Sequence, residues 1–339
     1  MTAALRVLAP GLHTTVQDLG RWGYQAIGVP VSGALDGFAL RLANALAGNR
    51  LDLPGLEVMG SGPSFGVEAD SVRLAATGAG IEVDGAVVRG RSLTLVRGAT
   101  CRVVLDRDTA CGYVAVEGGI AVPRVMGSAA TFVRGGIGGF EGRALREGDT
   151  LPLAQAHAGE RAELRLPAPP PDGGRDRPIR VILGPQHELF SDAAIATLLE
   201  AEFRVSLSAD RMGMRLDGPP LRHRDGWDIV SDAIPTGAIQ VPGSGQAILL
   251  LADHQTTGGY PKIATVISAD LPVVGRRRPG DPMRFAAVTV EAAEALARAE
   301  ELRLRELVAG LEAATAEAGI NLAALWGGNL ISGVVSGRD

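Results

Sequence analysis

The densest group of reactive side chains lies in one segment, Asp253-His254-Gln255-Thr256-Thr257-Gly258-Gly259-Tyr260-Pro261-Lys262. The segment follows the apolar run Ala247–Leu251, so we expect a strand to end here and to present the polar side chains from a rigid element. Gly258 and Gly259 allow a ligand to approach the backbone closely. Lys262 can neutralise a carboxylate or phosphate, and Asp253 or His254 could exchange a proton.

Lys262 is the only lysine among the 33 Lys and Arg residues of the chain. An ammonium group differs from a guanidinium group in geometry, hydration and readiness to shift its pKa. We therefore infer a role for Lys262 that an arginine does not fill, with Asp253 orienting it. The segment predicts Lys262 and Asp253 as catalytic groups and the following substrate contacts: Gln255, Thr256, Thr257, Gly258, Gly259 and Tyr260.

Two other segments could bind an anion. In Arg134-Gly135-Gly136-Ile137-Gly138-Gly139-Phe140-Glu141-Gly142-Arg143, two arginines flank a glycine-rich backbone that suits a carboxylate or phosphate, although a series of tight turns fits equally well. In Ser208–Leu216, Asp210 could orient Arg211 or Arg215 for a planar carboxylate, or form an ordinary turn salt bridge. These segments predict Arg211 as a catalytic group and Arg134, Gly135, Gly136, Arg143 and Asp210 as substrate contacts.

Several familiar sites are excluded. A phosphate-binding P-loop ends in Gly-Lys-Ser/Thr, whereas the lone lysine follows Pro261, so any nucleotide site must be of another kind. The segment Gly62-Pro63-Ser64-Phe65-Gly66 matches a hydrolase pattern, but a strand and not a helix is expected to follow it. The five histidines lack metal-ligand spacing, so we predict no metal site.

The bulk composition bounds the class of protein. A chain of 339 residues suffices for two domains, and a net charge of -5 without a basic stripe argues against nucleic acid or anionic membranes as partners. The sequence has no apolar run of about 18 residues and no secretory leader, so we expect a cytoplasmic protein. Cys101 and Cys111 flank a turn near Arg107 and could lie on paired strands of one hairpin, as thiols.

The 46 glycines, 20 prolines and few aromatic residues favour many short strands joined by tight turns. One helix is expected from the N-cap Asp36 to the stop at Gly48. The Ala, Glu, Leu and Arg residues from Glu291 to about Ala318 favour helices over any strand, and an apolar tail from Ile320 to Val335 is expected to dock on the body or on a partner. Strands are expected at Ser71–Ala76, Ile81–Val88, Ser92–Val96, Cys101–Leu105, Tyr113–Val116, Ile179–Leu183, Ala238–Val241, Ala247–Leu251 and Ile263–Ile267.

A Pro/Gly-rich stretch at 166–178 cannot form a regular helix or central strand, and we place the domain boundary there. The predicted organisation is a β-rich domain at 1–165, the linker at 166–178, a second β domain at 179–290 and a helical segment with the tail at 291–339.

The strings Thr-Thr-Val-Gln-Asp-Leu-Gly-Arg from Thr14 and Gln-Thr-Thr-Gly-Gly-Tyr-Pro-Lys-Ile-Ala from Gln255 closely resemble the family of 5-oxoprolinase C subunits, also described as biotin-dependent carboxyltransferases related to allophanate hydrolase subunit 2 and urea carboxylase. Where His254 stands, the family more often has an arginine. The resemblance covers Pro10–Asn49, Gly127–Asp149, Gly184–Leu189, Asp210–Leu216, Ser231–Pro242 and Ala252–Pro272, and it adds Gln240 to the expected substrate contacts.

The resemblance implies a mainly β fold of cyclophilin-like β-barrel modules with a few short helices. It also implies an ATP-dependent 5-oxoprolinase, using ATP with Mg²⁺ shared with partner chains, in a complex with a KipI-like B subunit, and with an A subunit that is LamB/YcsF-like. Biotin is carried on a lysine usually set between methionines, and Lys262 follows a proline, so no biotin is expected on this chain. Two alternatives remain: a carboxyltransferase component of a biotin-dependent enzyme, and a non-enzymatic antagonist of a kinase-inhibitor protein.

Overall fold

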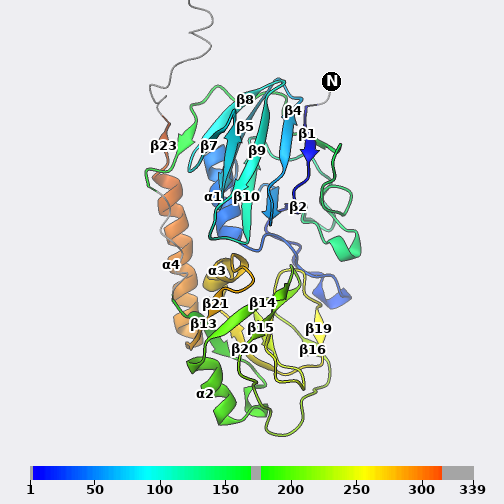
Figure 1. Ribbon diagram of the computed structural model, residues 1–339, viewed down its shortest axis with the longest axis vertical. Helices are drawn as coiled ribbons and strands as arrows, with labels where there is room; N and C mark the ends of the chain where they lie inside the picture. The colour runs from blue at the N-terminus through cyan, green and yellow to red at the C-terminus, as the bar shows by residue number, and fades with distance from the viewer. Residues whose placement is uncertain (1–2, 169–176, 315–339) are drawn as a thin grey trace, which may run out of the picture.

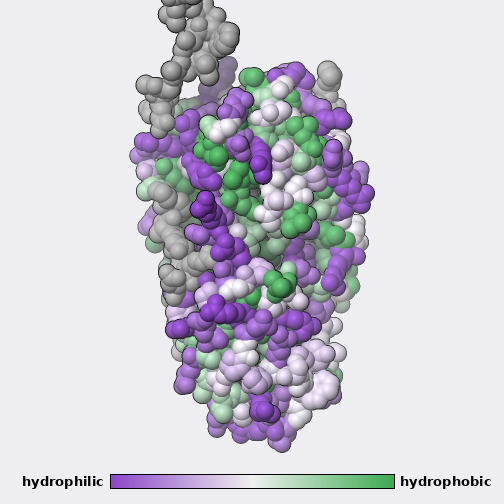
Figure 2. All heavy atoms as spheres, in the orientation of Figure 1, coloured by the Kyte–Doolittle hydropathy of each residue, from purple (hydrophilic) through white to green (hydrophobic). Residues whose placement is uncertain are grey.

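The computed structural model describes residues 3–168 and 177–314, which build two β-rich modules stacked along the long axis of the molecule (Figure 1). We call the upper module of Figure 1 the sandwich and the lower one the barrel, and the long helix α4 (Val290–Ala309) runs along the side of both. In Figure 2 apolar side chains gather on the upper module, whereas polar and charged ones cross the middle of the visible face. The predicted mainly β architecture is confirmed.

The sandwich consists of two antiparallel sheets. In order, the first contains β11 (Thr150–Pro152), β1 (Ala4–Ala9), β4 (Ser64–Val67), β9 (Thr100–Leu105), β6 (Ala79–Val83) and β7 (Ala86–Val88). The second contains β2 (His13–Gln17), β3 (Gly55–Met59), β10 (Cys111–Val116), β5 (Ser71–Thr77) and β8 (Ser92–Val96).

The side chains of a strand point alternately to its two faces, and this alternation determines which of them are buried. In β1, Leu5 and Val7 face the core between the two sheets while Arg6 is exposed, as the two-residue period of a strand requires. Every residue of β10 is buried, because Val114 faces that same core and Tyr113 faces a second core on the other side of the sheet.

The second core is built around α1 (Gly37–Ala47), which packs on the five-stranded sheet. Asp36 caps the helix by accepting a hydrogen bond from the Ala39 amide, and Gly48 ends it in the left-handed conformation with φ of +75°, so the helix expected here is confirmed. The same core contains Val181 and other interior residues of the barrel, so the two modules share one apolar interior.

The barrel is one eight-stranded sheet. Only Arg284 separates its two edge strands in the sequence, so the edges are brought together and the sheet is nearly closed. Its strands are antiparallel except for the parallel pair β13–β22, and in order they are β21 (Pro282–Met283), β14 (Phe203–Ala209), β15 (Gly213–Asp217), β18 (Ile248–Leu250), β17 (Ala238–Gln240), β20 (Lys262–Val266), β13 (Ile179–Leu183) and β22 (Phe285–Ala287).

The remaining elements are short. Two small antiparallel sheets pair β16 (Asp232–Ala233) with β19 (Thr257–Gly258) and β12 (Leu164–Arg165) with β23 (Glu312–Ala313). The other helical elements are α2 (Asp192–Glu200), α3 (Leu271–Gly275) and the 3-10 turns η1 (Gln25–Ile27), η2 (Val133–Gly135), η3 (His187–Leu189) and η4 (Ser268–Asp270).

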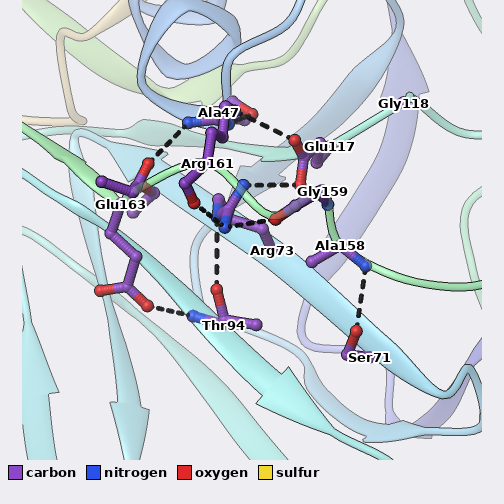
Figure 3. Close-up of polar contacts among 12 residues, drawn as sticks. Ala47, Ser71, Arg73, Thr94, Glu117, Gly118, Ala158, Gly159, Arg161 and Glu163 are labelled. Atoms are coloured by element: carbon purple, nitrogen blue, oxygen red, sulfur yellow. Dashed lines mark hydrogen bonds and ion pairs between the residues drawn. The ribbon is translucent and has the colours of Figure 1, made fainter.

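A charged network fastens the chain after β11 back onto the sandwich (Figure 3). The buried Arg73 of β5 donates to Glu117 at 2.9 Å and to the carbonyls of Gly159 and Arg161. Arg161 in turn donates to Glu117 and to the Ala47 carbonyl at the end of α1. Because the carboxylate and the carbonyls satisfy both guanidinium groups, this segment is anchored without regular secondary structure.

Two expectations about strands are corrected. The run Ile81–Val88 is a hairpin, β6 and β7, because Asp84 with φ of 50° and Gly85 turn the chain. Cys101 and Cys111 lie on β9 and β10, which belong to different sheets, because the intervening chain crosses from one sheet to the other.

The helix from Val290 ends at Ala309, and Glu312–Ala313 forms the strand β23, so the expectation of helix alone is wrong there. The chain forms a strand here because β12 is available to pair with it, although the local composition favours a helix. The part of that prediction from 315 to 318 and the apolar tail at 320–335 lie outside the described residues, as does most of the linker.

Candidate functional site

A cleft of about 470 Å³ opens where the turn η2 faces the barrel. Arg134 of η2 lines one side, and residues from β14, β15, β17 and β18 line the other. The cleft brings together five of the residues predicted as substrate contacts, from four separate segments: Arg134, Asp210, Gln240, Gln255 and Tyr260.

The polar groups of this cleft are mostly amides and guanidiniums. Gln240 is buried and donates to the Tyr260 carbonyl at 3.2 Å. Asp210, the one carboxylate of the lining, lies 3.8 Å from Arg134 and accepts from the amides of Met212 and Gly213. Such a lining suits a small polar molecule that carries a carboxylate or phosphate.

Gly258 of the central segment packs tightly beside the cleft. A Cβ on Gly258 would lie 2.8 Å from Ile234 and 3.0 Å from the Gln240 amide nitrogen. Thr257 and Gly258 form β19, while Thr256 accepts a backbone hydrogen bond from Ile234 through its carbonyl. The backbone of this segment is thus fixed by the small sheet β16–β19.

Lys262 is buried, with 2% of its surface exposed, and its amine pairs with Asp232 of β16 at 2.8 Å. Gln186 donates to the same carboxylate and accepts from the Lys262 amide. The hydrogen bond from Lys262 holds the pKa of Asp232 below its ordinary value. The expected pairing of Asp253 with Lys262 is therefore wrong, and the amine lies outside the lining of the cleft.

Asp253 instead pairs with Arg211. The guanidinium meets the two oxygens of Asp253 at 2.8 and 3.1 Å, and it also contacts Glu57 of β3 and the Gly33 carbonyl. Burial by itself lowers the pKa of Arg211, but the two carboxylates raise it above its ordinary value. Tyr113 donates to Glu57 at 2.7 Å. With its donors engaged in this interior network, Arg211 joins the sandwich to the barrel and does not face the cleft.

The glycine-rich arginine segment also differs from its predicted geometry. Arg143 donates to Glu141 and Asp149, and its pKa is raised chiefly by the hydrogen bond to Asp149. The amides of Gly135 and Gly136 donate to carbonyls within the turn. Of this segment, Arg134 alone lines the cleft, because the turns use the other donors internally.

His254 is buried, and both ring nitrogens have partners, the Gln255 carbonyl and the Thr236 hydroxyl. Burial lowers its pKa, so the ring is neutral near pH 7. Among the residues that the structure describes, no three His, Cys, Asp or Glu side chains are grouped as metal ligands would be.

Sequence reasoning missed three residues of this region. Glu57 stands alone as a charge inside the apolar strand β3, a signal that predicts a buried ion pair. Trp227, a rare residue type in this chain, lies in a polar loop beside Tyr260. Asp232 carried no such signal, because only the tertiary structure places it against Lys262.

The comparisons with known proteins agree with the resemblance seen in the sequence. The model of the family described as "Carboxyltransferase domain, subdomain A and B" matches residues 27–287. The chain is 38% identical to the C subunit of 5-oxoprolinase from Escherichia coli over 90% of this chain and 97% of that protein, and 36% identical to that of Haemophilus influenzae over 87% and 94%.

Among solved structures, the K. lactis urea amidolyase is similar with a TM-score of 0.82 and 29% identity, over 90% of this chain. The chain spans only 20% of that protein.

Proposed function

The chain belongs to the carboxyltransferase family of subdomains A and B, and on that premise we propose that it is the C subunit of an ATP-dependent 5-oxoprolinase, which converts 5-oxo-L-proline to L-glutamate. One observation carries the proposal: the similarity runs end to end, over 97% and 94% of the two 5-oxoprolinase proteins. By contrast the chain corresponds to a fifth of the urea amidolyase.

The enzyme we propose is hetero-oligomeric. A relative named as one part of an enzyme acts with other chains, and we infer that this chain assembles with the B and A subunits to form a complete catalytic site. The cleft supports this inference, because it is open and its one carboxylate is tied to backbone amides. The described residues contain no helix long and apolar enough to cross a membrane.

The cleft residues bind and orient the substrate in this proposal. Arg134 binds the carboxylate of 5-oxoproline, and Gln240 and Gln255 form hydrogen bonds with the lactam N–H and carbonyl. Tyr260 covers the ring. These contacts suit a small cyclic amide. Its N–H needs a hydrogen-bond acceptor and its carbonyl needs a donor, and a glutamine side chain provides both.

The lactam is a poor electrophile by itself. ATP, when bound with Mg²⁺ shared with the partner chains, supplies the activation that a stable amide requires. Arg215, the other cationic side chain among the residues that line the cleft, fits phosphate oxygens. Lys262 contributes as a positioning residue, because its pair with Asp232 holds the small sheet that carries Gly258.

Reconstitution tests the proposal. Purified alone, the chain is expected to show no ATP hydrolysis stimulated by 5-oxoproline, and together with the B and A subunits it is expected to release phosphate and glutamate in equal amounts. Arg134→Gln should raise KM for 5-oxoproline, while Arg284→Gln, a change at an exposed arginine of the barrel, should leave KM unchanged. A complete and folded complex that does not hydrolyse 5-oxoproline would refute the proposal.

A second function is favoured by the close structural match to the urea amidolyase. In that case the chain transfers a carboxyl group from biotin on another chain to a small amide. Incorporation of labelled bicarbonate into an amide, by a complex with a biotinylated partner, would support this function over the first.

A further inference from the structure

A second hollow adjoins the cleft. This hollow, which we call the aromatic groove, has a volume of about 540 Å³ and is lined by Arg215, Trp227, Pro242, Gly243, Ser244, Ile248 and Tyr260. Arg215, Ile248 and Tyr260 line both hollows, so the two are continuous. The mechanism proposed above uses the first hollow and leaves the aromatic groove without an occupant.

Two exposed aromatic rings line the groove. Trp227 is 50% exposed and Tyr260 is 39% exposed, and their ring centroids lie 6.2 Å apart with planes inclined by 42°. A Cβ on Gly243 would lie 2.9 Å from the indole, so the indole rests directly on the backbone of that glycine. An indole held in this way offers a flat apolar surface to a ligand.

Among the described residues that line the aromatic groove, the one charged side chain is that of Arg215, and it is positive. Arg215 lies where the two hollows meet. Its exposed side chain donates a hydrogen bond to Gln246 at 3.3 Å. Arg134 lies further along the cleft. Aromatic rings beside a guanidinium group match a molecule with a planar ring at one end and a polyanion at the other. A nucleotide has this form.

We propose that the aromatic groove binds the adenine ring of a nucleotide on Trp227, with the phosphates extending over Arg215 toward Arg134. The choice of adenine rests on the proposed function, which requires ATP. The chain has no P-loop, and the proposed site needs none, because side chains take the place of a glycine-rich phosphate loop.

Calorimetric titration of the full chain, without its partner chains, tests the proposal, with ADP, adenosine and tripolyphosphate as probes. Trp227→Leu should weaken ADP and adenosine about 5- to 150-fold and leave tripolyphosphate unchanged, since stacking acts on the base alone. Trp227→Phe should retain most of the affinity because it keeps an aromatic face. Arg215→Gln should weaken ADP and tripolyphosphate but not adenosine.

Two controls separate binding from folding. Trp22→Leu changes another exposed indole, one that does not line the groove, and should leave all three affinities unchanged. Gly243→Ala keeps the indole but pushes it outward, and should weaken ADP without shifting the melting temperature by more than a few degrees.

An equal ADP affinity in the wild type and Trp227→Leu, or no ADP binding at all, overturns the proposal. So does a Trp227→Leu chain that binds ADP normally but no longer retains the B subunit, because the groove would then be a protein interface. Failure of the groove proposal can be distinguished from failure of the proposed function. ADP bound on Trp227 in a complex inactive on 5-oxoproline refutes only the function, and an active complex indifferent to Trp227 refutes only the groove.

Discussion

Replacing Arg211 with methionine is expected to destabilise the protein strongly, because it removes the cation between two buried carboxylates. In the structure Arg211 contacts both oxygens of Asp253 and one oxygen of Glu57, and all three side chains are buried. Breaking such a network by removing one partner costs about 3–5 kcal/mol. With an unfolding entropy of about 2.1 cal/mol/K per residue, this corresponds to a melting temperature lower by about 4–7 °C.

Thermal unfolding followed by circular dichroism at pH 7 measures this loss of stability. Arg284→Met is the matched control, since Arg284 is 65% exposed and pairs with Glu202 at 3.3 Å, and its loss should cost less than about 1 kcal/mol. If Arg211→Met loses no more stability than this control, the buried network does not join the two modules as we argue.

Three further outcomes are expected. Burial raises the pKa of Cys101 to about 12 and also raises that of Cys111. Iodoacetamide at pH 8 should therefore label neither thiol in the folded protein and both thiols after denaturation. Detection of a labelled thiol in the folded protein by mass spectrometry would contradict this. Asp232→Asn should lower the melting temperature more than Lys262→Met, because the amine is 2% exposed and the carboxylate 49%, and the opposite order would count against a structural pair. Glu117→Gln should cost about 1–3 kcal/mol in chemical unfolding, since it weakens charged hydrogen bonds to the buried Arg73 and the partly exposed Arg161. An unchanged midpoint would refute that role.

Much of the site could be located from the sequence, but its contacts could not. Polar residues after the apolar run Ala247–Leu251 predicted a functional edge of a strand, and Gln255 and Tyr260 do line the cleft. The same reasoning paired Lys262 with Asp253, because they are neighbours in one short segment. In the structure these two side chains have different partners, since the segment is folded against β16 on one side and against the Arg211 loop on the other.

The sequence by itself determined the mainly β class, the helix between Asp36 and Gly48, and the family, because these depend on short-range periodicity, capping residues and local strings. Only the tertiary structure decided which charges meet. Arg211 reaches Glu57 across 154 positions of the chain, and Lys262 reaches Asp232 across 30. Ion pairing depends on distance through space, and that distance is set by how the two modules and their strands pack, which no local pattern records.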